Sequence, residues 1–260
     1  MRNRVDLTLF AHVVARPDAQ IDLAQAALLI AETEHPELDS ARYVRTLDRL
    51  GEQAARAIID AIEEPPFGAL EAADGGRPVE CLLRFLYEEA GFQGNTVDYY
   101  DPRNSFLNHV IDRRMGIPIT LAVVMMEVGK RAGIEVQGVS FPGHFLARVE
   151  GVRGPTFIDP FDGRALTRED LRSLYARVSG ERHKRDPDTR LLEAASKKQI
   201  LVRILNNLRG IYAAQGDLER LRGVLERMDV LAPSEEVREK LEELGGSTPW
   251  PTSTASFTLH

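Results

Sequence analysis

Apolar residues recur at helical spacing through the first 62 residues of the chain. They predict one helix that begins near Leu23 and ends before His35 and Pro36, because apolar side chains spaced by three and four residues share one helix face. A second helix is predicted from a cap at residue 39 or 40 to residue 62. Residues 64–78 contain three Pro and three Gly and therefore predict a loop.

A segment that is apolar almost all round lies at the centre of the chain. Two short helices, predicted over residues 79–91 and 104–116, precede it. Pro118 then takes the first position of a helix that ends before Gly133, since proline favours the first helical turn and glycine favours the position after the last. We expect this central helix to be buried on most sides, because it offers hardly any polar face to solvent.

The hydrophobic pattern changes from helical spacing to partial alternation beyond Gly133. Residues 135–141, 144–151 and 156–160 predict three short strands. A buried helix followed by an antiparallel meander of strands indicates an α+β fold.

Further helices are predicted after a charged linker over residues 179–190. They span residues 191–215 and 218–231, are joined by a glycine stop and an aspartate cap, and form a helical hairpin that a third helix follows near residues 235–244. We therefore divide the chain into a helical amino-terminal region (1–94), an α+β core (95–178), the helical hairpin (190–245) and a mobile tail (246–260).

Composition narrows the possible classes of function. Of the 260 residues, 43% are hydrophobic and 28% are charged, which is typical of a soluble globular protein, and the net charge of −7 argues against nucleic-acid binding. The single cysteine, Cys81, excludes an intramolecular disulfide and favours a reducing compartment, so we expect the cytoplasm. Asp6 and His12 interrupt the apolar start, which therefore predicts a first helix or strand instead of a signal peptide. No apolar stretch is long enough to cross a bilayer, and we expect no membrane partner.

His144 and Asp159 are the candidate catalytic residues of the predicted sheet. They fall on consecutive strands, and a His oriented by an Asp is the general-base half of a Cys-His-Asp triad. We expect a ring nitrogen of His144 to be held by Asp159. The alternatives are a histidine that serves only in packing and an aspartate that caps the turn before Pro160.

Three segments of the core resemble a known family. They read NSFLNHVIDRRMGIPITL (104–121), GVSFPGHFLARV (138–149) and FIDPFDG (157–163), and they are similar to the SirB family of bacterial transglutaminase-like proteins. The resemblance covers most of residues 20–232. It implies a transglutaminase-like, papain-like core, in which a Cys begins a buried helix and a His and an Asp follow on strands, with a helical region before it and a tetratricopeptide-like segment after it.

The resemblance also implies that His144 and Asp159 match the superfamily's His and Asp, and that Pro118 takes the position of its Cys. A proline has no nucleophile and no N–H, whereas a thiolate at that position is stabilised by the helix amino terminus. Thr120 is not expected to replace the cysteine, because two residues along a helix rotate the side chain by about 200°. Cys81 is expected to be a buried structural residue, since it lies on an apolar helical face.

The segment before the central helix adds further residues to a possible cleft. We expect Asn104 and Asn108 to share a helix face and to hydrogen-bond the loop that leads into Gly116, with ligand binding as the alternative. A metal site built from His109, His144 and Asp159 is a further alternative, but we expect neither a metal nor a cofactor. The candidate cleft residues are Asn104, Asn108, Arg113, Pro118 and Thr120.

We therefore expect a transglutaminase-like pseudoenzyme that binds a protein or peptide segment in the remaining cleft, or regulates through it. One alternative is a hydrolase or acyltransferase in which His144 and Asp159 act with an unrecognised nucleophile or an activated water. A third is a structural protein whose helical ends dock to another protein. We expect the carboxy-terminal hairpin to pack on the core, because helical repeats usually need about three units to stand alone. The sequence leaves the oligomeric state open.

Overall fold

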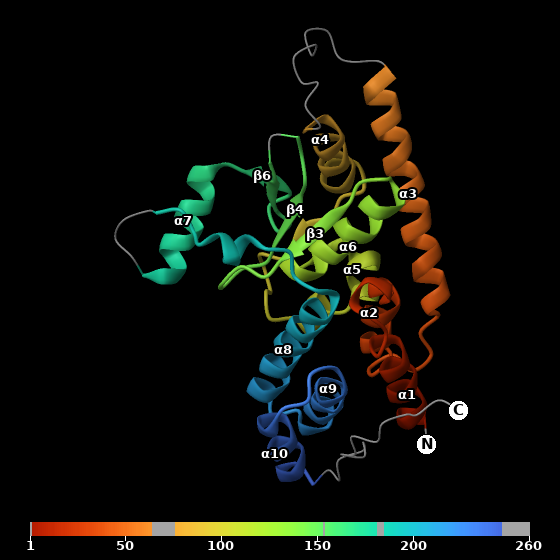
Figure 1. The fold of residues 1–260 in the computed structure, drawn as a ribbon. Coiled ribbons are helices and arrows are strands. Elements are labelled where there is room, and N and C mark those ends of the chain that lie inside the picture. Colours follow the sequence, from red (N-terminus) through yellow and green to blue (C-terminus); the bar gives the residue numbers. More distant parts are fainter. Residues whose placement is uncertain (1, 64–75, 153, 181–184, 246–260) are drawn as a thin grey trace, which may run out of the picture.

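Helices surround a small antiparallel sheet in the computed structural model, which describes residues 2–63, 76–152, 154–180 and 185–245 (Figure 1). The helices of these ranges are α1 (Arg2–Val14), α2 (Leu23–Ala31), α3 (Ser40–Glu63), α4 (Gly76–Arg84), α5 (Leu107–Arg113), α6 (Pro118–Arg131), α7 (Arg168–Ser179), α8 (Lys197–Gln215), α9 (Leu218–Leu231) and α10 (Glu235–Glu243). The strands are β1 (Gln93–Gly94), β2 (Met115–Gly116), β3 (Val136–Val139), β4 (Leu146–Val149), β5 (Thr156–Asp159) and β6 (Arg164–Leu166). None of the described helices combines the length and the apolar character that crossing a membrane requires.

The α+β fold predicted from the sequence is confirmed. Strands β3, β4, β5 and β6 pair in chain order as an antiparallel meander, and β1 pairs with β2 in parallel. Successive side chains point to opposite faces of the sheet, so Ala147 and Ile158 join the main core while Leu146 and Phe157 face the other side. Helix α7, which stands to one side of the sheet in Figure 1, belongs to the core on that second face. Neither α7 nor β6 was predicted.

Local end signals place several helix boundaries where the sequence predicts them. Pro118 is the first residue of α6, and Ile117 precedes it in extended conformation. Gly216 has a φ of 68° and ends α8, and the side chain of Asp217 then accepts a hydrogen bond from the N–H of Arg220 in α9. The predicted hairpin of residues 191–231 therefore has its turn in the predicted place.

Other boundaries differ from the prediction. Helix α8 begins at Lys197 and not at residue 191, because Ser196 caps it by accepting a hydrogen bond from the N–H of Gln199 (3.1 Å). Helix α5 is shorter than the predicted 104–116, because Arg114 has a φ of 55° and stops it. Helix α4 begins at Gly76, within the predicted loop. The rest of that loop and the predicted mobile tail fall on residues 64–75 and 246–260, outside the described residues.

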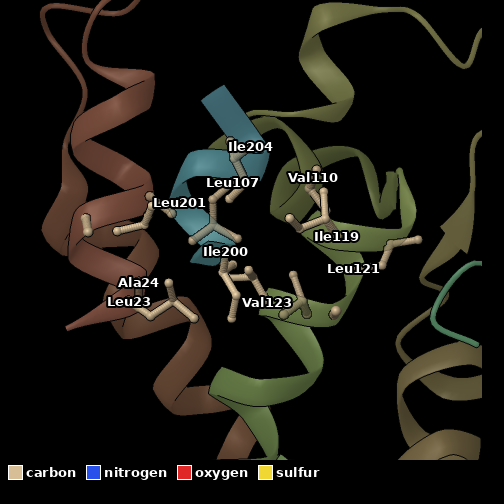
Figure 2. Packing of buried hydrophobic residues seen from close by; sticks show 14 of the residues in the cluster. Leu23, Ala24, Leu107, Val110, Ile119, Leu121, Val123, Ile200, Leu201 and Ile204 are labelled. Atoms are coloured by element: carbon tan, nitrogen blue, oxygen red, sulfur yellow. The ribbon is translucent and has the colours of Figure 1, made fainter. Parts of the chain in front are cut away.

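The central helix α6 is buried as predicted, and it organises the main core. It packs against α3, α5 and α8 and against strands β3 and β4. Figure 2 shows how Ile200, Leu201 and Ile204 of α8 lie among apolar side chains of α2, α5 and α6. Helix α8 therefore shares its core with the rest of the fold, which fixes its position beside the amino end of α6.

Candidate functional site

The side chains of His144 and Asp159 meet at the end of the sheet. The Nε2 atom of His144 lies 2.9 Å from Oδ2 of Asp159, and both side chains are largely buried. Asp159 is the last residue of β5. His144 lies in a bend just before β4 and not on the strand itself, because Gly143 has a φ of 66° and turns the chain there. Since Nε2 is taken by the carboxylate, Nδ1 is the ring nitrogen left for other partners.

Hydrogen bonds keep the Asp159 carboxylate in its charged form. Burial by itself raises the pKa of Asp159. The hydrogen bond and charge of His144, together with the backbone N–H groups of Phe161 and Asp162, lower the pKa by more than burial raises it. The pKa of Asp159 therefore lies below its ordinary value. The Phe161 N–H donates to Oδ1 at 2.9 Å. A carboxylate held in this way orients the imidazole and fixes its tautomer.

The turn after Asp159 is anchored on two other segments of the chain. The hydroxyl of Tyr87 donates to the carbonyl oxygen of Pro160 at 2.5 Å. The ring of Phe161 packs on Gly94, where a Cβ atom would come within 2.6 Å of the ring. The missing side chain at Gly94 thus allows the close packing that holds this turn, and with it Asp159, in place.

Arg203 of α8 holds the loop that carries His144. Its guanidinium donates to the carbonyl oxygens of His144 (3.0 Å) and Phe141 (3.3 Å), and it lies 5.8 Å from the centre of the Phe145 ring. Burial lowers the pKa of Arg203. Burial raises the pKa of Tyr99 more than the charge of Arg203 lowers it.

The amino end of α6 is closed by polar contacts. Pro118 is buried, and it provides neither a nucleophilic atom nor an N–H. The Thr120 hydroxyl is also buried; it donates to the carbonyl oxygen of Asn104 (2.6 Å) and accepts from the N–H of Ile117 (3.3 Å). Cys81, on α4, lies within the main apolar core. Thr120 and Cys81, the two residues that the sequence offers as alternative nucleophiles, are therefore both buried.

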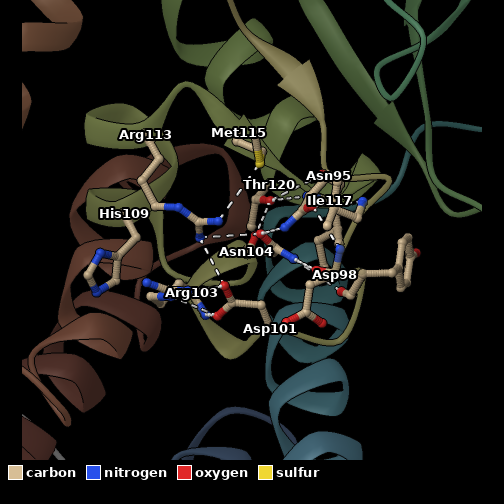
Figure 3. Close-up of polar contacts among 12 residues, drawn as sticks. Asn95, Asp98, Asp101, Arg103, Asn104, His109, Arg113, Met115, Ile117 and Thr120 are labelled. Atoms are coloured by element: carbon tan, nitrogen blue, oxygen red, sulfur yellow. Dashed lines mark hydrogen bonds and ion pairs between the residues drawn. The ribbon is translucent and has the colours of Figure 1, made fainter.

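Asn104 is the centre of a buried hydrogen-bond network that Figure 3 shows. Its Nδ2 donates to the carbonyl oxygens of Asp98 (2.7 Å) and Tyr99 (3.2 Å), and its Oδ1 accepts from Asn95 (3.0 Å) and Arg113 (3.4 Å). The prediction that the Asn104 side chain hydrogen-bonds the loop before Gly116 is wrong. The side chain instead makes hydrogen bonds to the loop of residues 95–101. The reason is that Asn104 lies in a 3₁₀ turn before α5, with its side chain beneath that loop.

A groove of about 540 Å³ lies between this loop and α8. The loop contributes Tyr99 and Tyr100, whose rings meet edge to face with their centres 5.4 Å apart. Ile117, directly before Pro118, also lines the groove. Helix α8 contributes the remaining lining residues, which are Asn206, Asn207, Gly210, Ile211, Ala214 and Gln215.

Two other sequence candidates lie elsewhere. Asn108 is buried on α5, and its Oδ1 has no hydrogen-bond partner in the described part of the chain. His109 contacts His35, with the two Nε2 atoms 2.8 Å apart, and it is not part of the contact between His144 and Asp159. Over the described ranges, no group of three or more His, Cys, Asp or Glu side chains is arranged to hold a metal ion.

The sequence did not identify the residues that line the groove or Arg203. The pair Tyr99 and Tyr100 gives a local signal, since two aromatic residues are adjacent in a polar loop, and in the structure Tyr100 is 75% exposed. Arg203 gives none, because an arginine on an amphipathic helix is ordinary and its contacts lie some 60 residues away in the chain.

The fold and the paired His and Asp define a class, and the comparison with known families agrees with it. The chain belongs to the transglutaminase-like superfamily, whose family model matches residues 41–206, from α3 into α8. The chain is similar to a UPF0162 protein of Xylella fastidiosa (38% identical over 235 residues, covering 88% of this chain and 78% of the relative). A UPF0162 protein of Pseudomonas aeruginosa is 35% identical over 223 residues, covering 84% of this chain and 77% of the relative. The human F-box only protein 21 is 29% identical over 147 residues, covering 53% of this chain and 22% of that protein. No solved structure matches the chain significantly.

Proposed function

We propose that this transglutaminase-like domain binds a polypeptide segment in the groove beside α6 and forms no covalent bond with it. The observation that carries the proposal is Pro118 at the first position of α6, the position that the resemblance assigns to the nucleophilic cysteine. Acyl transfer through a covalent intermediate requires a thiol, hydroxyl or amine at that point. Proline supplies none of these groups.

The groove has the features of a peptide-binding site. Tyr99 and Tyr100 offer large, rigid aromatic surfaces with polar tips, which are common at protein interfaces. The side-chain amides of Asn206 and Asn207 make no hydrogen bond within the described residues, so they are available to pair with a peptide backbone. At Gly210 an added Cβ would meet no atom within 4 Å, so a ligand can approach the helix backbone closely there.

The small part of the human F-box only protein 21 that is similar to this chain supports a role as a binding or regulatory module. The similar region makes up 22% of that protein, so the relative carries this region within a much longer chain. A domain that is combined with other segments in this way suits a binding or regulatory role.

The alternative is a hydrolase or acyltransferase, and one observation favours it. The Nε2 atom of His144 is held by a buried carboxylate, which leaves Nδ1 for proton transfer. This function would need an activated water as the attacking group, because Thr120 and Cys81 are both enclosed.

We further propose that the chain is a member of the SirB group, and that the α8–α9 hairpin is a single tetratricopeptide-like unit that serves as part of the core. The apolar contacts of Ile200, Leu201 and Ile204 support the second point.

Selection of peptides from a displayed random library tests the proposed binding. The wild-type chain should enrich a family of peptides that Gly210→Trp no longer binds, because the indole occupies the groove. Gln53→Trp, which adds the same side chain to an exposed position of α3, should bind them as the wild type does. Equal binding by Gly210→Trp would show that the peptides bind elsewhere and would refute the groove as the binding site.

Assays of peptide hydrolysis and of acyl transfer from a γ-glutamyl donor test the absence of catalysis. The wild-type chain and His144→Ala should be equally inactive. Turnover by the wild type that disappears in His144→Ala would overturn the proposal in favour of the hydrolase or acyltransferase.

A further inference from the structure

A second cavity, of about 590 Å³, continues the groove beside α6 along helix α8. Residues 206–215 of α8 line the groove and residues 198–207 line the second cavity, so Asn206 and Asn207 belong to both. Ser140, which follows β3, and the end of α9 line the second cavity on its other sides. The two cavities therefore form one surface that follows α8 for most of its length.

The charge of this surface changes from one end to the other. Among the described residues, those that line the groove are uncharged, and Tyr99, Tyr100 and Ile117 make that end largely apolar. The charged residues in the described lining of the second cavity are Lys198 and Arg203, and both are cations. The surface thus combines an apolar end with a positive end.

The Arg203 guanidinium is half-buried without a carboxylate partner. Its two Nη atoms donate to the Ser140 hydroxyl and to the carbonyl oxygens of Phe141 and His144, which are neutral acceptors. Within the described residues no carboxylate forms an ion pair with it. Burial accordingly lowers the pKa of Arg203, because removing a charge from water is costly unless an opposite charge lies nearby.

Arg131 shows how the same chain compensates another partly buried guanidinium. Burial lowers the pKa of Arg131 as well, but the carboxylates of Asp48 and Glu127, at 2.7 and 2.5 Å, raise it by more. In the described part of the chain no carboxylate makes this contribution at Arg203. The surroundings of Arg203 therefore favour an anionic group from outside.

Both cations keep donors that a ligand can reach. Three hydrogen bonds occupy three of the five N–H groups of Arg203 and leave the Nε–H unpaired. The Nε atom is not among the enclosed unpaired atoms of the described residues, so it is open to solvent. The ammonium group of Lys198 makes neither a hydrogen bond nor an ion pair within the described ranges.

The carboxylate of Asp18 does not supply the negative charge. It accepts hydrogen bonds from the backbone N–H groups of Lys197 (3.0 Å) and Lys198 (3.1 Å), and it is therefore used in capping the amino end of α8. Because that helix end is already occupied, the Lys198 and Arg203 side chains carry the positive charge that faces the cavity.

The separation of the two ends sets a spacing for a bound peptide. Gly210, in the groove, and Arg203 are seven positions apart on α8, which corresponds to roughly 10 Å along the helix axis. An extended peptide rises by about 3.3 Å per residue, so it covers this separation in about three residues.

We propose that the peptide bound in the groove carries an aspartate or glutamate about three residues from the apolar side chain that packs on Tyr99 and Tyr100. The acidic side chain pairs with Arg203 and Lys198. This inference rests on the proposed peptide binding and names the kind of peptide. An acidic side chain is favoured over a terminal carboxylate, because terminal carboxylates are usually held by backbone N–H groups, and those at the start of α8 are already bonded.

The displayed random library tests the inference when its peptides are fused at their carboxyl ends, which leaves no terminal carboxylate. Peptides that the wild type enriches and Gly210→Trp loses should carry Asp or Glu three or four residues from an aromatic or aliphatic residue. Selection with Lys198→Glu should remove this preference and favour Lys or Arg at the same position. Arg56→Glu makes the same change of charge at an exposed position of α3 and should enrich the same peptides as the wild type.

Fluorescence anisotropy with the most enriched peptide, synthesised with both ends blocked, measures the size of the effect. Replacing its acidic residue by the matching amide should weaken binding to the wild type about tenfold, the loss of one charge-assisted hydrogen bond. The same replacement should change binding to Lys198→Glu by less than about twofold. Lys198 is the position to vary because Arg203 also holds the His144 loop. Circular dichroism shows that each variant is folded.

The outcomes separate this inference from the proposed function. If the wild type enriches no peptide that Gly210→Trp loses, the groove fails as a peptide site and the inference fails with it. If such peptides show no acidic preference, or if Lys198→Glu enriches the same peptides as the wild type, peptide binding stands and the inference is overturned. Tighter binding of a peptide whose free carboxyl end is its only acid would also overturn it.

Discussion

Asn104 is the side chain on which the shape of the candidate groove depends. It is fully buried, and three of its hydrogen bonds are 3.2 Å or shorter: two to the carbonyl oxygens of Asp98 and Tyr99 and one from Asn95. Its own carbonyl oxygen accepts the Thr120 hydroxyl, which ties the loop to the amino end of α6. Truncation to alanine removes the three side-chain bonds and leaves their partners unsatisfied.

We expect Asn104→Ala to lower the free energy of unfolding by about 3 kcal/mol, at roughly 1 kcal/mol for each of the three bonds. The bond from Arg113, at 3.4 Å, is counted as negligible. Asn104→Asp keeps the volume but turns an acceptor toward two carbonyl oxygens, and should lose about 2 kcal/mol for the two bonds that the amide donates. Asn206→Ala is the matched control, since its exposed amide lacks a partner within the described residues and its loss should change stability by less than about 0.5 kcal/mol.

Urea unfolding followed by circular dichroism measures these differences, and hydrogen exchange locates them. In Asn104→Ala the amides of residues 96–101 should exchange faster through local opening. Amides of α3 that exchange only through global unfolding should speed up by no more than the loss of global stability. A loss of less than about 1 kcal/mol in Asn104→Ala would show that the loop does not depend on this network. If Asn206→Ala lowered the free energy of unfolding by as much as Asn104→Ala, the stability loss would arise in helix α8 or in the unfolded chain and not in the Asn104 network.

Three further predictions concern the Asp159 carboxylate, the positive φ of Arg114 and two glycines with a positive φ. Asp159→Asn should destabilise the protein at pH 7, but progressively less as the pH falls below about 3.9. The reason is that a carboxylate whose pKa is lowered in the folded state stabilises the protein above its unfolded pKa, and this stabilisation is lost as the pH falls through the folded pKa. A difference in urea midpoint that does not depend on pH would contradict this prediction. Arg114→Gly should be about 1 kcal/mol more stable than Arg114→Ala, because both lose the guanidinium but only glycine adopts a φ of 55° without strain; equal melting temperatures would refute it. Gly163→Ala should be more destabilising than Gly180→Ala, because both positions have a positive φ but only the first would bring a Cβ into the ring of Tyr87; calorimetry of the two variants decides it.

The parts of the fold that were predicted correctly have local causes. A proline at the first helical position marks the start of α6, and Gly216 followed by Asp217 marks the turn of the hairpin, because each residue acts on its own backbone. The missed helix α7 also has a readable local signal: Thr167 and Asp170 form a capping box. The rest of the segment is largely polar, and only Leu171 and Leu174 of the helix are buried, so it shows little apolar periodicity.

The parts of the site that were not predicted are set by contacts between distant segments. The contact between His144 and Asp159 follows from the pairing of neighbouring strands, and the sequence could suggest it. The position of Arg203 beside the His144 loop depends on how α8 packs on α6, and no local pattern encodes that packing. The groove between Tyr99 and Asn206 follows from the same packing, so its lining could not be read from either segment alone.

The residues around Pro118 serve as a joint between elements, and this supports the proposal that the position does not carry out chemistry. A Cβ on Gly116 would come within 2.9 Å of the Thr120 hydroxyl and 3.1 Å of Val110, so the glycine allows α5, β2 and α6 to meet closely. Thr120 uses its hydroxyl to bond Asn104 and Ile117, and Pro118 supplies a backbone already set for the first helical turn. Each of these side chains is occupied in fixing the amino end of α6. A cysteine nucleophile at the same point would need an exposed thiol and free N–H groups around it, and the Thr120 hydroxyl already takes up the N–H of Ile117. The amino end of α6 is therefore tightly held beside the groove, which is a property that the proposed peptide-binding site needs.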